Sequence, residues 1–163
     1  MDKIIESGIL RGRPFGGVAI LIRNDLAANA NFVAKSDRYI IVTIGSLVLV
    51  NIYASSSSNT NDKYLINADM ISQIDEKLDN FTDLPVVIGG DFNIDLREKC
   101  KISTMFTDFF KRNNLTLGIN AQAYSQSYTY SSASLGSCSM IDSIAVNNDL
   151  VSKVVGNEVL DYE

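Results

Sequence analysis

The residues best suited to chemistry lie at 86–93, where an apolar run ends in two glycines, an aspartate and an asparagine. The run 86–88 predicts a buried central strand. Side chains two residues apart on an extended backbone point the same way, so Asp91 and Asn93 are expected to converge. The two side chains could bind Mg²⁺ through their oxygen atoms, or they could contact a phosphate. The structural alternative is an Asx turn that closes the strand.

Two more polar residues stand out against apolar surroundings. Tyr53 ends the apolar segment 47–53 directly before a serine-rich loop, and its phenol can donate to a phosphate oxygen. The alternative is a half-buried aromatic at a sheet edge. Asp142 is the one charge within the apolar stretch 140–146. A carboxylate there is rare unless it is paired or functional, and both interpretations remain open.

Composition limits the function classes. The 163 residues are 46% hydrophobic and 20% charged, which predicts one globular domain over 1–163. The net charge of -5 gives no support to a broad basic surface that grips nucleic acid, although a metal-binding cleft in a nuclease is itself acidic. The sequence has no histidine, which closes this chain to any mechanism that uses an imidazole.

The sequence favours an intracellular protein, nuclear or cytoplasmic. No apolar run approaches the roughly 18 residues that span a bilayer, so no membrane partner is expected. The first residues lack the pattern of a signal peptide. Cys100 and Cys138 fit no zinc or redox spacing and are expected to be reduced thiols.

The elements that must position these residues are strands with a few helices between them. Residues 38–44 and 47–53 predict a hairpin that turns at 45–46. Apolar residues at three- and four-residue steps predict a helix of about five turns that ends near Leu78 and is capped by Thr60 or Asn61. A second amphipathic helix surrounds 105–110. Further strands are predicted at 17–22, 127–130, 140–146 and 154–162, and a short turn or helix at 149–151. This alternation indicates a layered α/β protein.

In this order, these blocks resemble the endonuclease/exonuclease/phosphatase superfamily. Residues 89–93 are similar to its Gly-Asp-Phe-Asn signature, 50–53 to its tyrosine strand and 140–146 to its later Ile-Asp strand. The opening 6–20 is similar to the apurinic-type endonuclease domain that non-LTR retrotransposons encode alongside a reverse transcriptase. The resemblance covers nearly the whole chain.

The resemblance implies an α/β fold, a four-layer sandwich of two mixed sheets flanked by helices. It also implies hydrolysis of DNA phosphodiesters with Mg²⁺ or Mn²⁺. Asp91 would be the general base that orients or deprotonates water. Asn93 would hold the scissile phosphate and, with Asp91, contact the metal. Tyr53 would hydrogen-bond the phosphate, and Asp142 would orient a histidine.

The sequence departs from the family pattern at both ends. The family's glutamate metal ligand, its early asparagine and its catalytic histidine have no counterparts here. We therefore expect an incomplete sandwich, weak metal binding and poor cleavage by this chain alone. The alternative is a non-catalytic module that binds nucleic acid or protein on the same scaffold. Strand edges left open predict a homodimer, or a companion chain that completes the fold.

Overall fold

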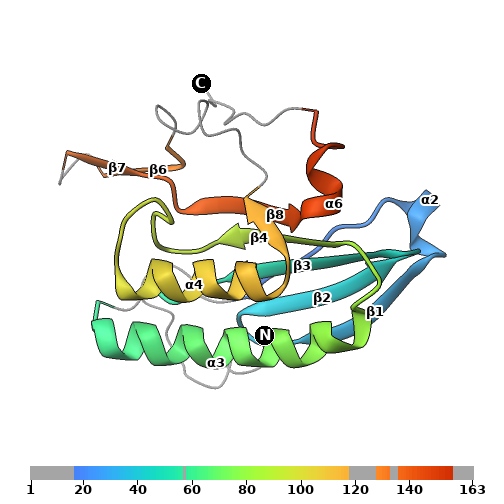
Figure 1. Ribbon diagram of the computed structural model, residues 1–163, viewed down its shortest axis with the longest axis horizontal. Helices are drawn as coiled ribbons and strands as arrows, with labels where there is room; N and C mark the ends of the chain where they lie inside the picture. The colour runs from blue at the N-terminus through green and yellow to red at the C-terminus, as the bar shows by residue number, and fades with distance from the viewer. Residues whose placement is uncertain (1–16, 57, 118–127, 133–135, 156–163) are drawn as a thin grey trace, which may run out of the picture.

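A six-stranded mixed sheet forms the frame of the molecule, with its strands in the order β1-β2-β3-β4-β8-β5 (Figure 1). The computed structural model describes residues 17–56, 58–117, 128–132 and 136–155. The sheet consists of β1 (Ala30–Lys35), β2 (Tyr39–Ile44), β3 (Leu47–Tyr53), β4 (Val86–Asp91), β5 (Leu115–Leu117) and β8 (Asp142–Asn147). A second, antiparallel sheet pairs β6 (Tyr130–Ser132) with β7 (Ser137–Ser139).

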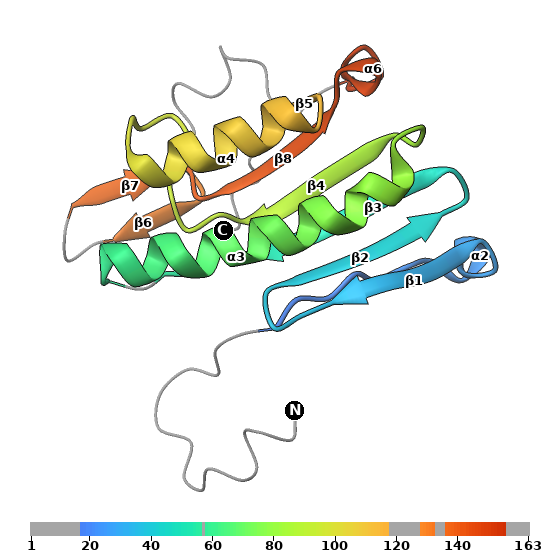
Figure 2. The same cartoon turned by 60° about the horizontal axis from the view of Figure 1, so that its bottom comes forward.

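Two long helices cover one face of the larger sheet, as Figure 2 shows. They are α3 (Thr60–Leu78) and α4 (Lys101–Arg112). The described part of the chain also has three short helices, α2 (Asn24–Ala27), η1 (Asp79–Phe81) and α6 (Asn148–Val151), at turns of the chain. The layered α/β class is therefore confirmed. No helix among the described residues is long and apolar enough to cross a bilayer.

The predicted hairpin and helices are confirmed, with one correction at a helix start. β2 and β3 pair antiparallel, with Ile44 opposite Leu47 across the predicted turn. The first helix is capped by Asn59, whose side chain accepts from the backbone amides of Asn61 and Asp62. The expectation of Thr60 or Asn61 as the cap was wrong because Asn59 already supplies the acceptor that the first free amides need.

The predicted strand 17–22 was wrong. The segment pairs with no strand that the structure describes, and Leu21 is 94% exposed. It is attached by hydrogen bonds from the Asn51 side chain to the carbonyl of Ala19 (2.9 Å) and from the Gly17 amide to Asp37 (3.1 Å). An apolar run shows that side chains favour burial but not which surface receives them, and this run lacks ladder pairing. The predicted strand 154–162 lies largely outside the described residues.

The core lies between the sheet and the two helices. On β3 and β4 every second residue is buried there, namely Val48, Val50, Ile52, Val86 and Ile88. Helix α4 adds Phe106, Phe109 and Phe110. Phe92, directly after β4, is fully buried and meets the rings of Phe106 and Phe110 edge-on, at 5.2 and 5.8 Å between centroids. The chain that leaves β4 is thus fixed to α4 by an aromatic contact.

Gly90 is required where β4 passes β3. Its φ is +139°, and a Cβ atom there would lie 2.0 Å from the carbonyl oxygen of Ile52. At Gly89 the closest atom to such a Cβ is the Ile144 side chain, at 3.4 Å. A Cβ atom can therefore be accommodated at Gly89 but not at Gly90.

We predict that Gly90→Ala lowers the free energy of unfolding by about 3 kcal/mol or more, because backbone strain adds to a clash with backbone. Gly89→Ala, the matched control, should cost about 1 kcal/mol or less. Urea unfolding followed by circular dichroism measures both. Equal stability of the two variants would contradict the close backbone contact between β3 and β4 at Gly90.

Candidate functional site

Three of the four predicted site residues lie in one row across neighbouring strands. The parallel pairing of β3 with β4 places Tyr53 opposite Asp91. The antiparallel pairing of β4 with β8 places Asp142 opposite Asp91 on the other side. Alternate residues such as Ile52 and Ile88 face the helices, so the row lies on the opposite face of the sheet. Adjacent strands are about 4.8 Å apart, which brings the three side chains together.

Asn93 reaches the same place by a turn rather than by strand alternation. The strand ends at Asp91, and Asn93 has a φ of +50°. Its amide donates to Oδ1 of Asp91 (2.8 Å), and its side chain Nδ2 donates to the carbonyl of Ala54 (2.8 Å). The Asx turn considered as the structural alternative is therefore present. The expectation of an extended backbone through Asn93 was wrong, because the strand ends at Asp91 and the Asx turn that follows gives Asn93 a left-handed backbone.

Lys63, in the first turns of α3, supports this turn from the helix side. Its ammonium donates to the carbonyl oxygen of Asn93 at 2.6 Å. Its charge also favours the ionised form of Asp91. Lys63 could not be predicted from the sequence, because a lysine on a polar helix face carries no local signal of a contact thirty residues away.

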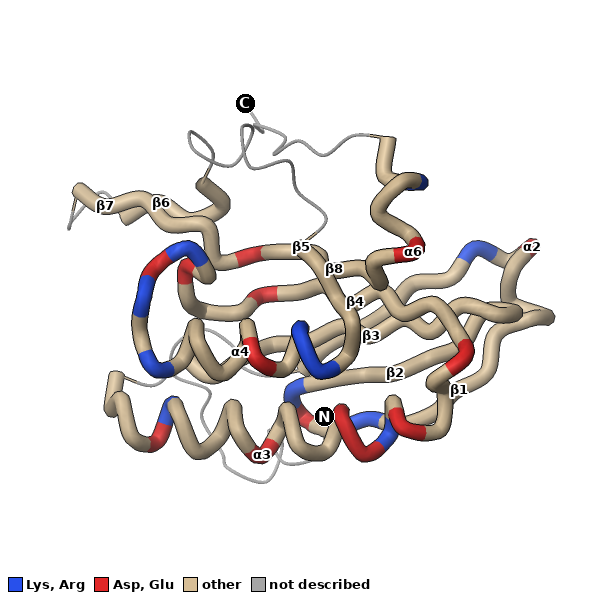
Figure 3. Tube along the Cα trace, in the orientation of Figure 1, with Lys and Arg blue, Asp and Glu red and all other residues tan. Residues whose placement is uncertain are grey.

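The electrostatics of the row are set mainly by the burial of Asp91, to which the facing carboxylate of Asp142 adds. Figure 3 shows neighbouring acidic segments on β4 and β8. Burial raises the pKa of Asp91, and the negative charge of Asp142 raises it further, while the Asn93 amide and Lys63 act in the opposite direction. Ionised Asp91 is thus a stronger base than an ordinary aspartate, and a positive charge placed nearby would stabilise its ionised form.

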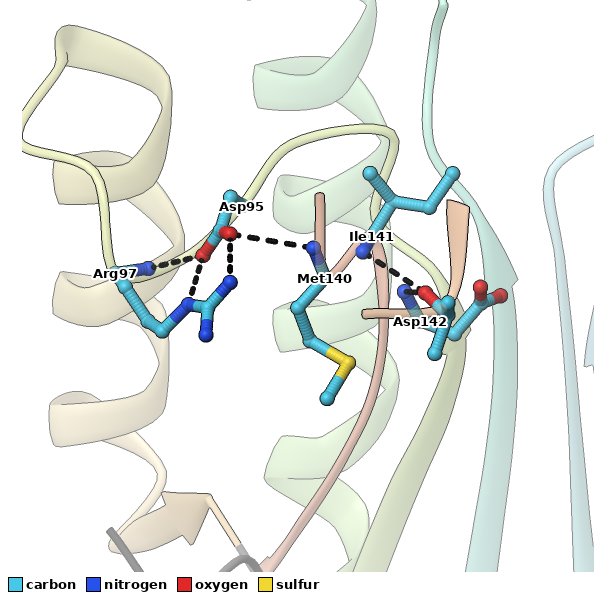
Figure 4. Close-up of polar contacts among 6 residues, drawn as sticks. Asp95, Arg97, Met140, Ile141 and Asp142 are labelled. Atoms are coloured by element: carbon cyan, nitrogen blue, oxygen red, sulfur yellow. Dashed lines mark hydrogen bonds and ion pairs between the residues drawn. The ribbon is translucent and has the colours of Figure 1, made fainter. Parts of the chain in front are cut away.

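A third aspartate, Asp95, links the loop after β4 to the segment that leads into β8 (Figure 4). It is buried, and its carboxylate accepts from the Arg97 backbone (3.0 Å), the Arg97 side chain and the Met140 amide (3.2 Å). Arg97 accordingly lowers the pKa of Asp95. Next along the chain, the amides of Ile141 and Asp142 donate to the Thr129 hydroxyl (both 3.1 Å). These contacts fix β8 beside the turn after β4.

Asp95 was also missed by sequence analysis. An aspartate two residues before an arginine in a polar loop is common, and only the fold reveals its contact with Met140.

The donor atoms at this site fit a hard divalent cation, though sparsely. Two facing carboxylates and the amide oxygen of Asn93 are oxygen donors of the kind that Mg²⁺ and Mn²⁺ prefer. The carboxylate repulsion at Asp91 would be relieved by a cation. Within the described ranges, however, no group of three or more acidic, cysteine or histidine side chains gathers in one place. The residues present therefore fit a cation bound with low affinity.

No protein-family model matches this sequence, and no curated protein matches it. Solved structures do. The endonuclease domain of TRAS1, a telomere-specific non-LTR retrotransposon, superposes with a TM-score of 0.61 at 12% identity, over 85% of this chain and 68% of that one. An AP endonuclease from Archaeoglobus fulgidus superposes with a TM-score of 0.58 at 14% identity, over 76% and 60%.

A third structure is the 3′ phosphatase NExo from Neisseria, bound to a product DNA hairpin. Its TM-score is 0.56 at 15% identity, over 76% of this chain and 60% of that one. This chain has the endonuclease/exonuclease/phosphatase fold. The fold expected from the resemblance is confirmed, and nuclease structures share it. The chain spans 60% or less of the length of the two Neisseria structures.

We predict that Asp91→Asn stabilises the protein at pH 7 by roughly 0.2–1 kcal/mol, because it removes one of two facing like charges. The folded pKa of Asp91 is raised above 3.8, so the folded protein takes up a proton first as the pH falls. The advantage of the variant should therefore shrink as the pH falls through that raised pKa. Urea unfolding at several pH values measures it. A variant less stable than wild type at pH 7 would refute the assigned repulsion.

Asp95→Asn is the matched control with the opposite sign. It should destabilise at pH 7 by about 1–2 kcal/mol, because a charge-assisted contact is lost while Arg97 stays partly exposed. The pKa of Asp95 is lowered, so its contribution is present above 3.8 and disappears as the pH falls through the lowered folded value.

Proposed function

We propose that this chain binds DNA at the row of Tyr53, Asp91 and Asp142 and hydrolyses a phosphodiester there slowly, with Mg²⁺ or Mn²⁺. The observation that carries the proposal is the strand register that aligns these side chains on one face. Support comes from the fold, which this chain shares with structures of an AP endonuclease and a retrotransposon endonuclease domain.

Each residue has a role that its surroundings suit. Asp91, with its raised pKa, accepts the proton of the attacking water. Tyr53 donates its phenol O–H to a phosphate oxygen and so stabilises charge that develops in the transition state. Asn93 directs its side-chain amide to the phosphate. The turn that carries it is fixed by hydrogen bonds with Lys63, Asp91 and Ala54. Asp142 increases the basicity of Asp91 and the negative charge that attracts a cation.

Asp91 and Asn93 are the proposed metal-contacting residues, with Asp142 beside them. When bound, the cation would neutralise the facing carboxylates and polarise the phosphate. Sparse ligands predict weak binding. The sequence holds no histidine, so the proton acceptor in this chain is a carboxylate, and we expect a low rate.

A second candidate function is DNA binding without cleavage. It is favoured by one observation: no cluster of three acidic, cysteine or histidine side chains occurs in the part of the chain that the structure describes. Salt-dependent binding without strand cleavage would support this second function.

We predict slow nicking of supercoiled plasmid that requires Mn²⁺ or Mg²⁺ and that falls by at least about a hundredfold in Asp91→Ala, since the proton acceptor is removed. Conversion to the open circular form is followed on agarose gels with excess protein. Asp25→Ala is the control, because Asp25 is exposed and, among the described residues, forms its ion pair with the nearby Arg23.

Two outcomes would test whether the nicking arises at this site and whether it is slow. Nicking that Asp91→Ala leaves unchanged would show that the activity does not arise from this site. Rapid nicking by wild type that Asp91→Ala abolishes would contradict the expected low rate while supporting the site.

For further partners we propose a homodimer through the strand edges, or a companion chain that completes the site. Strand β1 ends one edge of the sheet and exposes 62% of Phe32. Sedimentation velocity would show the dimer, and a clean monomer at high concentration would contradict it. We also propose an intracellular setting, nuclear or cytoplasmic. Cys100 and Cys138, both free thiols, are compatible with it.

A further inference from the structure

Arg38 extends the row of site residues by one strand. It directly precedes β2, and its carbonyl accepts the backbone amide of Tyr53 at 2.8 Å. The next pair, Tyr39 and Ile52, is buried under the helices. This bond extends the pairing of β2 with β3 by one residue, so Arg38 lies beside Tyr53 at the end of the sheet, where it also borders a hollow lined by Asp69 and Met70 of α3.

The side chain of Arg38 contacts Tyr53 directly. Its guanidinium carbon lies 5.9 Å from the centre of the Tyr53 ring, and Nη1 donates to the Tyr53 carbonyl at 3.4 Å. These contacts use one N–H donor and one face of the group. The other N–H donors of the guanidinium have no partner among the residues that the structure describes, so they can bind a ligand.

Arg38 differs from the other arginines that the structure describes. Arg23, Arg97 and Arg112 each pair with a carboxylate, whereas Arg38 has no ion pair within the described ranges. A cation without a carboxylate partner, placed beside a tyrosine in an acidic protein, suits an anionic ligand. The planar fork of donors matches the oxygens of a phosphate.

Spacing indicates which phosphate this would be. Arg38 lies two strands from Asp91, or about 10 Å at roughly 4.8 Å per strand. A DNA strand carries one phosphate about every 3.4 Å of helix axis. When one phosphate lies at Asp91, another of the same strand falls within reach of Arg38.

We propose that Arg38 binds a phosphate of the DNA strand other than the one to be cleaved, and so fixes the direction in which the strand crosses β8, β4, β3 and β2. This inference rests on the proposed DNA-cleaving function. Arg38 is a positioning residue in this account, since it contacts the substrate backbone and does not take part in the proton transfer.

The test is binding of a short fluorescein-labelled DNA duplex, followed by fluorescence anisotropy over a series of salt concentrations. Arg38→Gln should weaken binding about tenfold at low salt and reduce the slope of log affinity against log salt by about 1, as loss of one phosphate contact requires. Arg38→Lys keeps the charge and should retain most of the slope. Arg112→Gln, which removes the same charge from an exposed pair with Asp75, should match wild type.

Several outcomes would overturn the inference. If Arg38→Gln and Arg112→Gln weaken binding equally, the effect is one of net charge alone. If wild type binds and Arg38→Gln keeps its affinity and salt slope, this inference fails while the proposed function stands. If wild type neither binds nor nicks DNA, both fail. If Arg38→Gln has lost its folded circular dichroism spectrum, Arg38→Lys decides, because lysine keeps the charge but loses the planar fork of donors: affinity lowered several-fold at low salt supports the contact, and affinity equal to that of wild type rejects it.

Discussion

The burial of Phe92 is the constraint on which the site depends. Its ring is inserted edge-on between Phe106 and Phe110, and its backbone amide donates to Ile141 at 2.7 Å. Asp91 and Asn93 flank this anchored residue and cannot move independently of it. Burying a phenylalanine stabilises by about 1.5–3 kcal/mol, enough to maintain a left-handed turn at Asn93.

The position of this turn places the negative charges of Asp91 and Asp142 side by side. Asp91 is half-buried and faces Asp142, and the contacts that offset this arrangement are few: the Asn93 amide and the more distant Lys63. Asp95 shows the contrasting case, a buried carboxylate fully engaged by Arg97 and Met140. The first arrangement costs stability and suits binding a cation, while the second stabilises the loop that fixes β8.

The sequence predicted the elements whose periodicity is strong and local. The hairpin of β2 and β3, helices α3 and α4, and the strand before Asp91 were all predicted from apolar spacing. Strands β1, β5 and β7 were not. β5 and β7 have three residues each, too few to show a period, and β1 alternates weakly. The run 17–22 misled because apolar composition does not specify a partner surface.

The same distinction holds for the site. Tyr53, Asp91, Asn93 and Asp142 stood out because each is a polar residue at the end of an apolar run or within one. Arg38, Lys63 and Asp95 did not, since each acts through a contact that only strand register or helix packing creates. Residue types thus indicated which chemistry to expect, while pairing between distant segments determined which side chains assist it.

The central claim is that the aligned strand ends form one cation-binding site, and paramagnetic relaxation by Mn²⁺ tests it directly. In ¹⁵N-labelled protein titrated with Mn²⁺, the account predicts that the amide signals of Gly90, Asn93 and Asp142 broaden first, while those of α3 near Leu78 stay sharp. Broadening that begins at other acidic surfaces and leaves these three amides unaffected would contradict it.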